Sequence, residues 1–215
     1  MNVEDPRDVW QRRYANPVGA GPSYQADPWL NGWQSLLECA RTTTLLDLGC
    51  GPGRDTAYLL DQGYRVLSFD YARSALQTLR HDLPESVPVQ VDLRQGLPLA
   101  AHCLQVIIAS LSLHYFPWEQ TERIVADLRR CLKVDGILLA RFNSINDVQF
   151  GARGQQGGTN HYYQVGEVMK RFFDEAGLRA LFAAGWQIES LAEKTIYRYG
   201  RAKVVWEVVV QKVNQ

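Results

Sequence analysis

Residues 45–56 read Leu-Leu-Asp-Leu-Gly-Cys-Gly-Pro-Gly-Arg-Asp-Thr, and this stretch decides the fold. An apolar run ends in an acidic residue and then breaks into glycines before a helical pattern resumes. This pattern is typical of a parallel strand that turns into a loop whose backbone N–H groups cradle a ligand. We therefore expect a strand over residues 44–48, a ligand-binding loop after it, and a helix over residues 54–62.

The composition is that of an ordinary globular protein, with 215 residues of which 46% are hydrophobic and 21% charged. The 23 basic residues balance the 23 acidic ones, so the net charge gives no general attraction for nucleic acid. No apolar run reaches the roughly 18 residues of a membrane-spanning helix, and the N-terminus lacks a leader pattern. We expect a cytoplasmic protein that binds neither nucleic acid nor membrane. The four scattered cysteines predict free, buried thiols and no metal site.

Strand-like and helix-like segments alternate on both sides of the glycine loop. Further strands are expected over residues 65–69, 87–91, 104–109 and 136–142, and further helices over residues 28–40, 73–83, 117–132 and 174–184. The last two apolar runs, residues 186–192 and 203–212, indicate an antiparallel hairpin. Alternation of this kind predicts an α/β fold with a doubly wound, Rossmann-like sheet that is mostly parallel and has seven strands.

We expect a single domain over residues 1–215. Its parts are an N-terminal arm and helix (1–40), a cofactor-binding core (42–143), an irregular segment (144–173), and a helix with the terminal hairpin (174–215). Asp27 and Pro28 indicate the start of the helix in the arm, and Trp10 and Tyr14 either anchor that arm or cover the cofactor. The irregular segment has no period and several glycines, which favours a lid or a mobile insertion.

In such sheets ligands bind beyond the carboxyl ends of the strands. Polar and glycine residues expected at that edge are Asp47, Gly49, Gly51, Gly53, Asp70, Asp92 and Ser110. Two ligands fit a glycine loop that is followed by a carboxylate: a dinucleotide and S-adenosylmethionine. Asp70 lies 21 residues after Gly49, near the offset of about 20 expected for a carboxylate that binds a ribose, and this offset suits both ligands.

The residues around the glycines favour S-adenosylmethionine. The dinucleotide fingerprint needs a third glycine where this chain has Arg54. A carboxylate at Asp47 repels a pyrophosphate but suits a ligand that carries an ammonium and a sulfonium. A nicotinamide-dependent oxidoreductase and an S-adenosylmethionine-binding protein without turnover remain as alternatives.

Residues 46–53 closely resemble the first motif of the class I S-adenosylmethionine-dependent methyltransferases, and the likeness covers residues 42–143. It implies that Asp47 and the backbone of Gly49 and Gly51 hold the methionine part, and that Asp70 binds the ribose hydroxyls. Tyr71 would lie against the adenine. The product would be S-adenosyl-L-homocysteine.

Beyond these residues, the resemblance implies that Asp92 accepts a hydrogen bond from the adenine amino group and that Leu93 adds a backbone and an apolar contact. Cys50, Arg54 and Ser110 complete the candidate cofactor site.

A narrower likeness concerns residues 53–56, the turn at 132–136 and the run 170–174, Lys-Arg-Phe-Phe-Asp, which are similar to the tellurite-resistance-type methyltransferases. Those enzymes are associated with a His-Arg pair near the last hairpin. The corresponding region here contains Arg198 but no histidine.

We expect a small-molecule acceptor, with thiol and chalcogen compounds among the candidates, and a monomer or homodimer. An anionic acceptor such as a thiolate needs no base, whereas a hydroxyl or ammonium acceptor needs one. His114, His161 and Arg198 are the candidate catalytic residues. The alternative roles are packing for His114 and His161 and a solvated surface position for Arg198.

Overall fold

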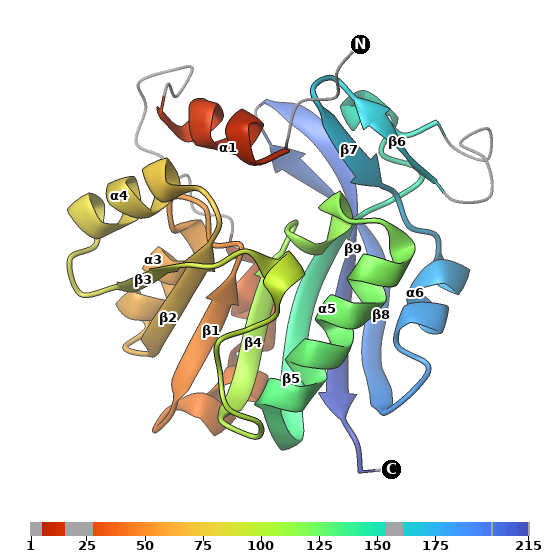
Figure 1. Cartoon of the computed structure of the whole chain (residues 1–215). Coiled ribbons are helices and arrows are strands. Elements are labelled where there is room, and N and C mark those ends of the chain that lie inside the picture. The colour runs from red at the N-terminus through yellow and green to blue at the C-terminus, as the bar shows by residue number, and fades with distance from the viewer. Residues whose placement is uncertain (1–5, 16–27, 154–160, 199, 215) are drawn as a thin grey trace.

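The computed structural model describes residues 6–15, 28–153, 161–198 and 200–214. Within these residues a seven-stranded sheet has the order β3-β2-β1-β4-β5-β9-β8 (Figure 1). Its strands are β1 (Thr44–Leu48), β2 (Arg65–Asp70), β3 (Val87–Gln90), β4 (Leu104–Ser110), β5 (Leu132–Asn143), β8 (Trp186–Arg198) and β9 (Arg201–Lys212). The first five strands are parallel, and β9 lies antiparallel between β5 and β8. The predicted fold class and the terminal hairpin are confirmed.

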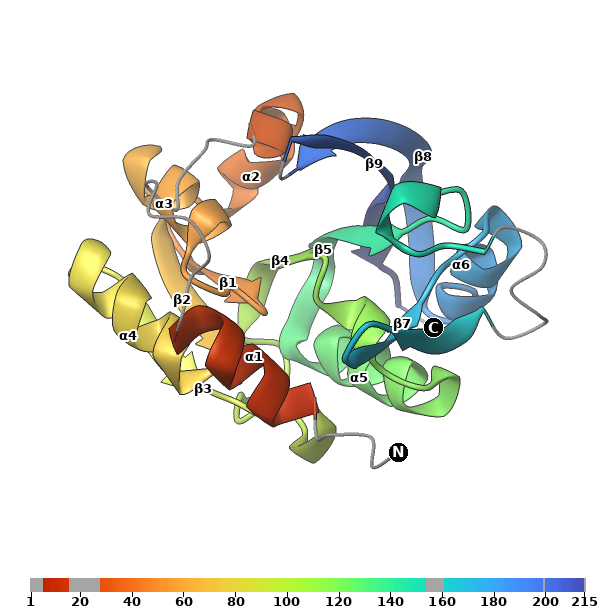
Figure 2. The same ribbon diagram turned by 90° about the horizontal axis from the view of Figure 1, so that it is seen from above.

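Helices cover both faces of the sheet (Figure 2). The α-helices are α1 (Pro6–Ala15), α2 (Gln34–Leu37), α3 (Arg54–Asp61), α4 (Arg73–Asp82), α5 (Trp118–Cys131) and α6 (Glu175–Leu181), and the 3-10 helices are η1 (Pro28–Trp33), η2 (Glu38–Ala40), η3 (Leu93–Gln95), η4 (Leu113–Tyr115) and η5 (Val148–Phe150). None of the helices in the described ranges is long and apolar enough to cross a membrane.

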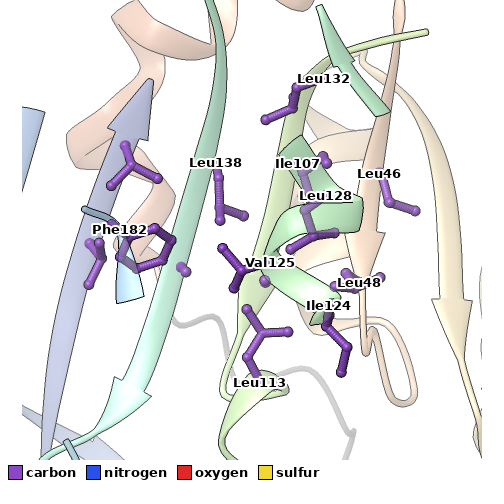
Figure 3. Close-up of a cluster of buried hydrophobic side chains, with 14 of the residues drawn as sticks. Leu46, Leu48, Ile107, Leu113, Ile124, Val125, Leu128, Leu132, Leu138 and Phe182 are labelled. Atoms are coloured by element: carbon purple, nitrogen blue, oxygen red, sulfur yellow. The ribbon is translucent and has the colours of Figure 1, made fainter. Parts of the chain in front are cut away.

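Alternate residues of each central strand supply two separate hydrophobic cores, because successive side chains of a strand point to opposite faces. Leu46 of β1 packs with Val125 and Leu128 of α5 on one face (Figure 3). Its neighbour Leu45 packs with Leu37 of α2 on the other face. Burial on both faces explains why the parallel strands are nearly continuous apolar runs.

Two local predictions are wrong. The expected continuous helix over residues 28–40 is divided into η1, α2 and η2, and Gly32 within it has a low intrinsic helix preference. The predicted cap at Asp27 lies outside the described residues. The expectation of buried thiols fails for Cys39 and Cys103, which are exposed, although all four cysteines are free.

The segment predicted to be irregular contains a second, two-stranded sheet. Strands β6 (Tyr162–Val165) and β7 (Val168–Arg171) form a hairpin in which Val165 pairs with Val168. The two-residue loop begins with Gly166, whose φ of +61° is the conformation that such tight hairpin turns require. Because a two-residue turn with glycine first is a recognisable hairpin signal, the sequence did carry a marker for this element.

Candidate functional site

The glycine loop lies at the point where the strand order reverses, between β1 and its two neighbours β2 and β4. Gly49 has φ +71° and approaches Ser112, which follows β4, so closely that a Cβ would collide with the Ser112 side chain. Gly51 has φ +54°, and a Cβ there would lie 2.9 Å from the Tyr14 hydroxyl. Both backbone conformations therefore favour glycine, and at Gly49 the space beside Ser112 also requires it.

Asp70, the last residue of β2, holds this loop in place. Its Oδ2 accepts a hydrogen bond from the Gly51 N–H at 2.8 Å, and its Oδ1 accepts one from the Ala72 N–H at 2.7 Å. Burial raises the pKa of Asp70, and the two N–H bonds oppose that rise. Since a carboxylate offers about four acceptor positions, Asp70 keeps capacity for ribose hydroxyls.

A second carboxylate, Asp47, is buried beneath the loop at 1% exposure. Thr56 donates a hydrogen bond to its Oδ2 at 2.6 Å. Burial, followed by the nearby charges of Asp55 and Asp70, raises the pKa of Asp47 to about 8. Three acidic groups, of which Asp47 and Asp55 are buried, thus lie close together, and a positively charged ligand fits this region better than a pyrophosphate does.

Asp55 belongs to the same acidic group, although it was not among the predicted site residues. Its Oδ1 accepts a hydrogen bond from the Trp29 indole N–H at 3.0 Å, which connects α3 to η1. The Arg141 guanidinium lies 4.6 Å from the centre of the Trp29 ring, and its Nε donates to the Ser110 hydroxyl at 3.0 Å. The predicted Ser110 therefore lies at this end of the sheet, where its hydroxyl helps to hold Arg141.

At the other side of the loop, Asp92 follows β3 and caps η3. Its carboxylate accepts from the Arg94 backbone N–H at 3.0 Å and from the Arg94 guanidinium at 2.7 to 3.2 Å. A cavity of about 680 Å³ opens beside it and is lined in part by Leu93, Arg123 and Asp127. The adenine contacts of Asp92, Leu93 and Tyr71 stay predictions, and Asp92 would have to share its oxygens with Arg94.

The structure also places two other predicted cofactor residues, Cys50 and Arg54. The Cys50 side chain packs against Leu76 and Leu79 of α4. Its N–H donates to the Phe69 carbonyl at 3.0 Å and its carbonyl accepts from the Gly53 N–H at 3.0 Å, so Cys50 shapes the loop from within. Arg54 begins α3 and is partly exposed.

The N-terminal helix α1 lies over the glycine loop and contacts α4 on one side and η4 on the other (Figure 2). Trp10 stacks on Tyr14, whose hydroxyl lies over Gly51, and makes an edge contact with Tyr115 of η4. Gln11 accepts a hydrogen bond from the Ser74 hydroxyl at 2.8 Å, which ties α1 to α4. These contacts fit both predicted roles of Trp10 and Tyr14, an anchor for the arm and a cover over the cofactor loop, and both roles stay predictions.

His114 of η4 lies two residues after Ser112, which packs against the glycine loop. His114 is buried at 2% exposure, and its ring lies 4.1 Å from that of Tyr115. Burial lowers the pKa of His114 well below its ordinary value, and the charges of Lys203, Lys170 and Arg198 lower it further. In this state His114 is neutral and a weak base. It is therefore better suited to form a hydrogen bond with a ligand than to remove a proton from one.

The other two catalytic candidates lie on different elements. Arg198 ends β8 and is close enough for its charge to act on His114. His161 precedes β6 with φ +40°, and its carbonyl accepts from the Phe172 N–H at 2.9 Å. The charge of Arg198 thus acts on His114, whereas the hydrogen bond of His161 lies within the β6–β7 region. No group of three or more potential metal ligands occurs in the described ranges.

Lys170 of β7 also acts on His114 by its charge, and it was not among the predicted site residues. It lies in the run Lys-Arg-Phe-Phe-Asp that the sequence singled out, but that run alone does not indicate which side chain faces the site. The approach of β7 to η4 is a tertiary contact, and Tyr162 of β6 donates a hydrogen bond to the Tyr115 carbonyl at 3.3 Å.

Comparison with known proteins agrees with this geometry. Residues 46–140 match the model of a methyltransferase domain. A trans-aconitate 2-methyltransferase of Enterobacter sp. (strain 638) is 35% identical over 96 residues, which cover 44% of this chain and 36% of that protein. A thiopurine S-methyltransferase of Pseudomonas putida (strain GB-1) is 36% identical over 69 residues, 32% of each chain. The chain thus matches less than half the length of these curated relatives.

A solved structure has the same fold over nearly the whole chain. The 1,6-didemethyltoxoflavin-N1-methyltransferase of Burkholderia thailandensis, solved with 1,6-didemethyltoxoflavin and S-adenosylhomocysteine, superposes with a TM-score of 0.72. It is 20% identical, and the match covers 97% of this chain and 88% of that one.

Proposed function

Because residues 46–140 form a methyltransferase domain of the class I, S-adenosylmethionine-dependent type, we propose that this protein transfers a methyl group from S-adenosylmethionine to a small-molecule acceptor. The observation that carries the proposal is the acidic group of Asp47, Asp55 and Asp70 around a glycine loop. A sulfonium and an ammonium are positively charged, and these carboxylates attract them.

The residues of the chain perform the positioning. Asp70 would hold the ribose hydroxyls while its bond to the Gly51 N–H keeps the loop closed around the methionine part. Tyr14 and Trp10 would cover the loop and exclude water. When bound, S-adenosylmethionine supplies an activated methyl group, whose carbon forms a bond to the acceptor as its bond to sulfur breaks and the electron pair stays on sulfur. Alignment of this kind can contribute about 7 to 11 kcal/mol to lowering a barrier.

No strong base is required if the acceptor arrives as an anion. His114 is neutral and weakly basic, which suits an acceptor that has already lost its proton. A thiol or chalcogen compound remains a candidate acceptor in this proposal, and the similar thiopurine S-methyltransferase acts on sulfur by its name. The similar trans-aconitate 2-methyltransferase makes a carboxylic acid a second candidate. A cytoplasmic location and a monomeric or homodimeric state belong to the same proposal.

Calorimetric titration of S-adenosylmethionine and S-adenosylhomocysteine tests the cofactor assignment. Asp70→Ala removes the group that would bind two ribose hydroxyls, and at about 1.5 to 3 kcal/mol for each hydrogen bond to a charged group the affinity should fall at least 100-fold. Asp61→Ala, a surface carboxylate at the end of α3, is the matched control. Unchanged affinity in Asp70→Ala would remove the basis of the proposal.

The enzymatic part is tested by measuring S-adenosylhomocysteine formation with thiols, chalcogen oxyanions, amines, phenols and carboxylic acids. Turnover of one class identifies the acceptor. Tight cofactor binding with no turnover of any compound favours a binding protein, and preference for a nicotinamide dinucleotide in a competition experiment favours an oxidoreductase.

A further inference from the structure

Strand β7, which carries Lys170, packs against η4, which carries the buried His114. Lys170 of β7, Arg198 of β8 and Lys203 of β9 each lie close enough for their charges to act on the His114 ring. Arg13 of α1 acts in the same way on Lys170. These residues are separated by up to 190 positions in sequence, from Arg13 to Lys203, so the concentration of positive charge is a product of the fold.

Two of these cations have carboxylate partners within the described chain. The Lys203 ammonium donates to Asp147 at 2.6 Å and to the Asn143 side-chain carbonyl at 2.8 Å, and all three residues are buried. Arg13 pairs with Glu167 at 3.3 Å. The charge of Lys203 is therefore balanced where it lies, and that of Arg13 is balanced at the surface.

Lys170 differs from them. It is only partly exposed, and within the described ranges no carboxylate lies at ion-pair distance from its ammonium. Burial and the charges of Lys203 and Arg13 lower the pKa of Lys170 to about 8. A partly desolvated ammonium among other cations is stabilised by an anion, and a missing partner of this kind is typical of a binding site.

His114 provides a second, independent sign of a ligand. Its Nδ1 atom is buried, and no described residue forms a hydrogen bond with it. An unsatisfied buried polar atom costs about 1 to 3 kcal/mol, so such atoms usually have a partner in the functional complex. The neutral ring can donate one N–H to an anion, and repulsion from the surrounding cations keeps the ring neutral.

The location fits an acceptor site. His114 lies two residues after Ser112, which packs against Gly49 of the cofactor loop. The Tyr115 ring lies 4.1 Å from the His114 ring, and Trp10 of α1 makes an edge contact with Tyr115. Because α1 contacts both β7 and Tyr115 of η4, an anion held between His114 and Lys170 would sit next to the cofactor loop and close to α1.

We infer that Lys170 and His114 form a subsite for a carboxylate of the methyl acceptor, so that the acceptor is a small carboxylic acid. This inference rests on the proposed function and deepens it. A carboxylate has two oxygens and one negative charge, which match the Nδ1 atom of His114 and the ammonium of Lys170. Tyr115 and Trp10 supply an apolar surface for the remainder of a small organic acid.

Paired probes test the subsite. Succinate, citrate and benzoate are titrated by calorimetry into the full-length protein saturated with S-adenosylhomocysteine, and the primary amide of each acid serves as its uncharged match. At least one acid should bind 10- to 100-fold more tightly than its amide, the change expected for a hydrogen bond to a charged group. Equal or tighter binding of every amide would overturn the inference.

Variants assign the effect to Lys170. Lys170→Gln should lose the preference for the acid, and Lys170→Arg should restore most of it because the charge is kept. Lys133→Gln is the matched control, since Lys133 lies at the start of β5, at the opposite end of that strand from Asn143. If Lys170→Gln keeps the full preference, the subsite lies elsewhere and the inference is wrong. If Lys170→Gln does not fold, the inference is decided by the acid and amide affinities of the wild type and of Lys170→Arg.

The same experiment separates this inference from the proposed function. Failure of S-adenosylhomocysteine to bind the wild-type protein would contradict the proposed function. Binding of S-adenosylhomocysteine together with methylation of uncharged acceptors alone would leave the proposed function intact and overturn the carboxylate subsite.

Discussion

Replacing Asp47 with asparagine should stabilise the cofactor-free protein at neutral pH and weaken its binding of S-adenosylmethionine. Burial and the neighbouring carboxylates raise the pKa of Asp47 from 3.8 to about 8. Between these values the folded protein binds a proton that the unfolded chain does not bind. Stability is therefore lost as the pH rises, at about 1.4 kcal/mol per pH unit. Asparagine carries no charge and removes this loss.

The free-energy difference between the two proteins should grow by about 2 kcal/mol from pH 6.5 to pH 8, which corresponds to roughly 4 to 8 °C in Tm for a chain of this size. His114 has the opposite effect below pH 6.5, because its pKa is lowered and only the unfolded chain binds the proton there. That contribution is common to both proteins and cancels in the difference. The surface variant Asp61→Asn controls for the loss of one charge.

Thermal unfolding at half-unit pH steps measures this difference. Calorimetric titration of S-adenosylmethionine in phosphate and in Tris at pH 7 measures protons released, because the two buffers differ in their heat of ionisation. A cationic ligand favours the charged form of Asp47, so the wild type should release close to one proton on binding and Asp47→Asn distinctly fewer. If the Tm values of the two proteins change in parallel with pH, and both proteins bind the cofactor with equal affinity, the reasoning is refuted.

Two further substitutions test other parts of the site. Lys203→Met leaves the Asp147 carboxylate buried without its cation and should destabilise the protein by about 3 to 5 kcal/mol, or roughly 6 to 20 °C in Tm by thermal unfolding. The double variant with Asp147→Asn should recover part of this loss. Equal Tm values for the wild type and Lys203→Met would contradict the prediction. Gly51→Ala places an alanine with left-handed backbone against the Tyr14 hydroxyl, and it should lower the free energy of unfolding by about 1 to 2 kcal/mol and weaken cofactor binding in calorimetry. Gly200 also has a left-handed backbone but open space around it, so Gly200→Ala controls for the backbone cost alone. Equal effects of the two substitutions would exclude a role for the contact with Tyr14.

Elements whose determinants are local could be predicted from the sequence. The strand β1 has the predicted bounds, 44–48, because an apolar run and the glycines after it mark both of its ends. Asp174 caps α6 as expected and accepts a hydrogen bond from the Gly177 N–H at 2.7 Å. The hairpin of β6 and β7 could have been found from Gly166, but its strands are too short for a clear alternation.

The cofactor loop was predictable because its residues are close together in sequence and have few alternatives. Left-handed glycines and a carboxylate at the end of the next strand indicate the same ligand class at each position. The engagement of Asp92 by Arg94 was not predictable in this way, since the motif is equally compatible with a free carboxylate and with a capped turn.

The sequence by itself determined the mostly parallel sheet, the glycine loop and the class of cofactor, because short-range pattern and residue chemistry are sufficient for these features. Only the tertiary structure decided the strand order and which charged side chains surround His114. Lys170 and His114 come from separate elements, and their proximity depends on how β7 packs against η4. The charge of a site is a sum over all residues that surround it, and that sum is defined only after folding has brought distant parts of the chain together.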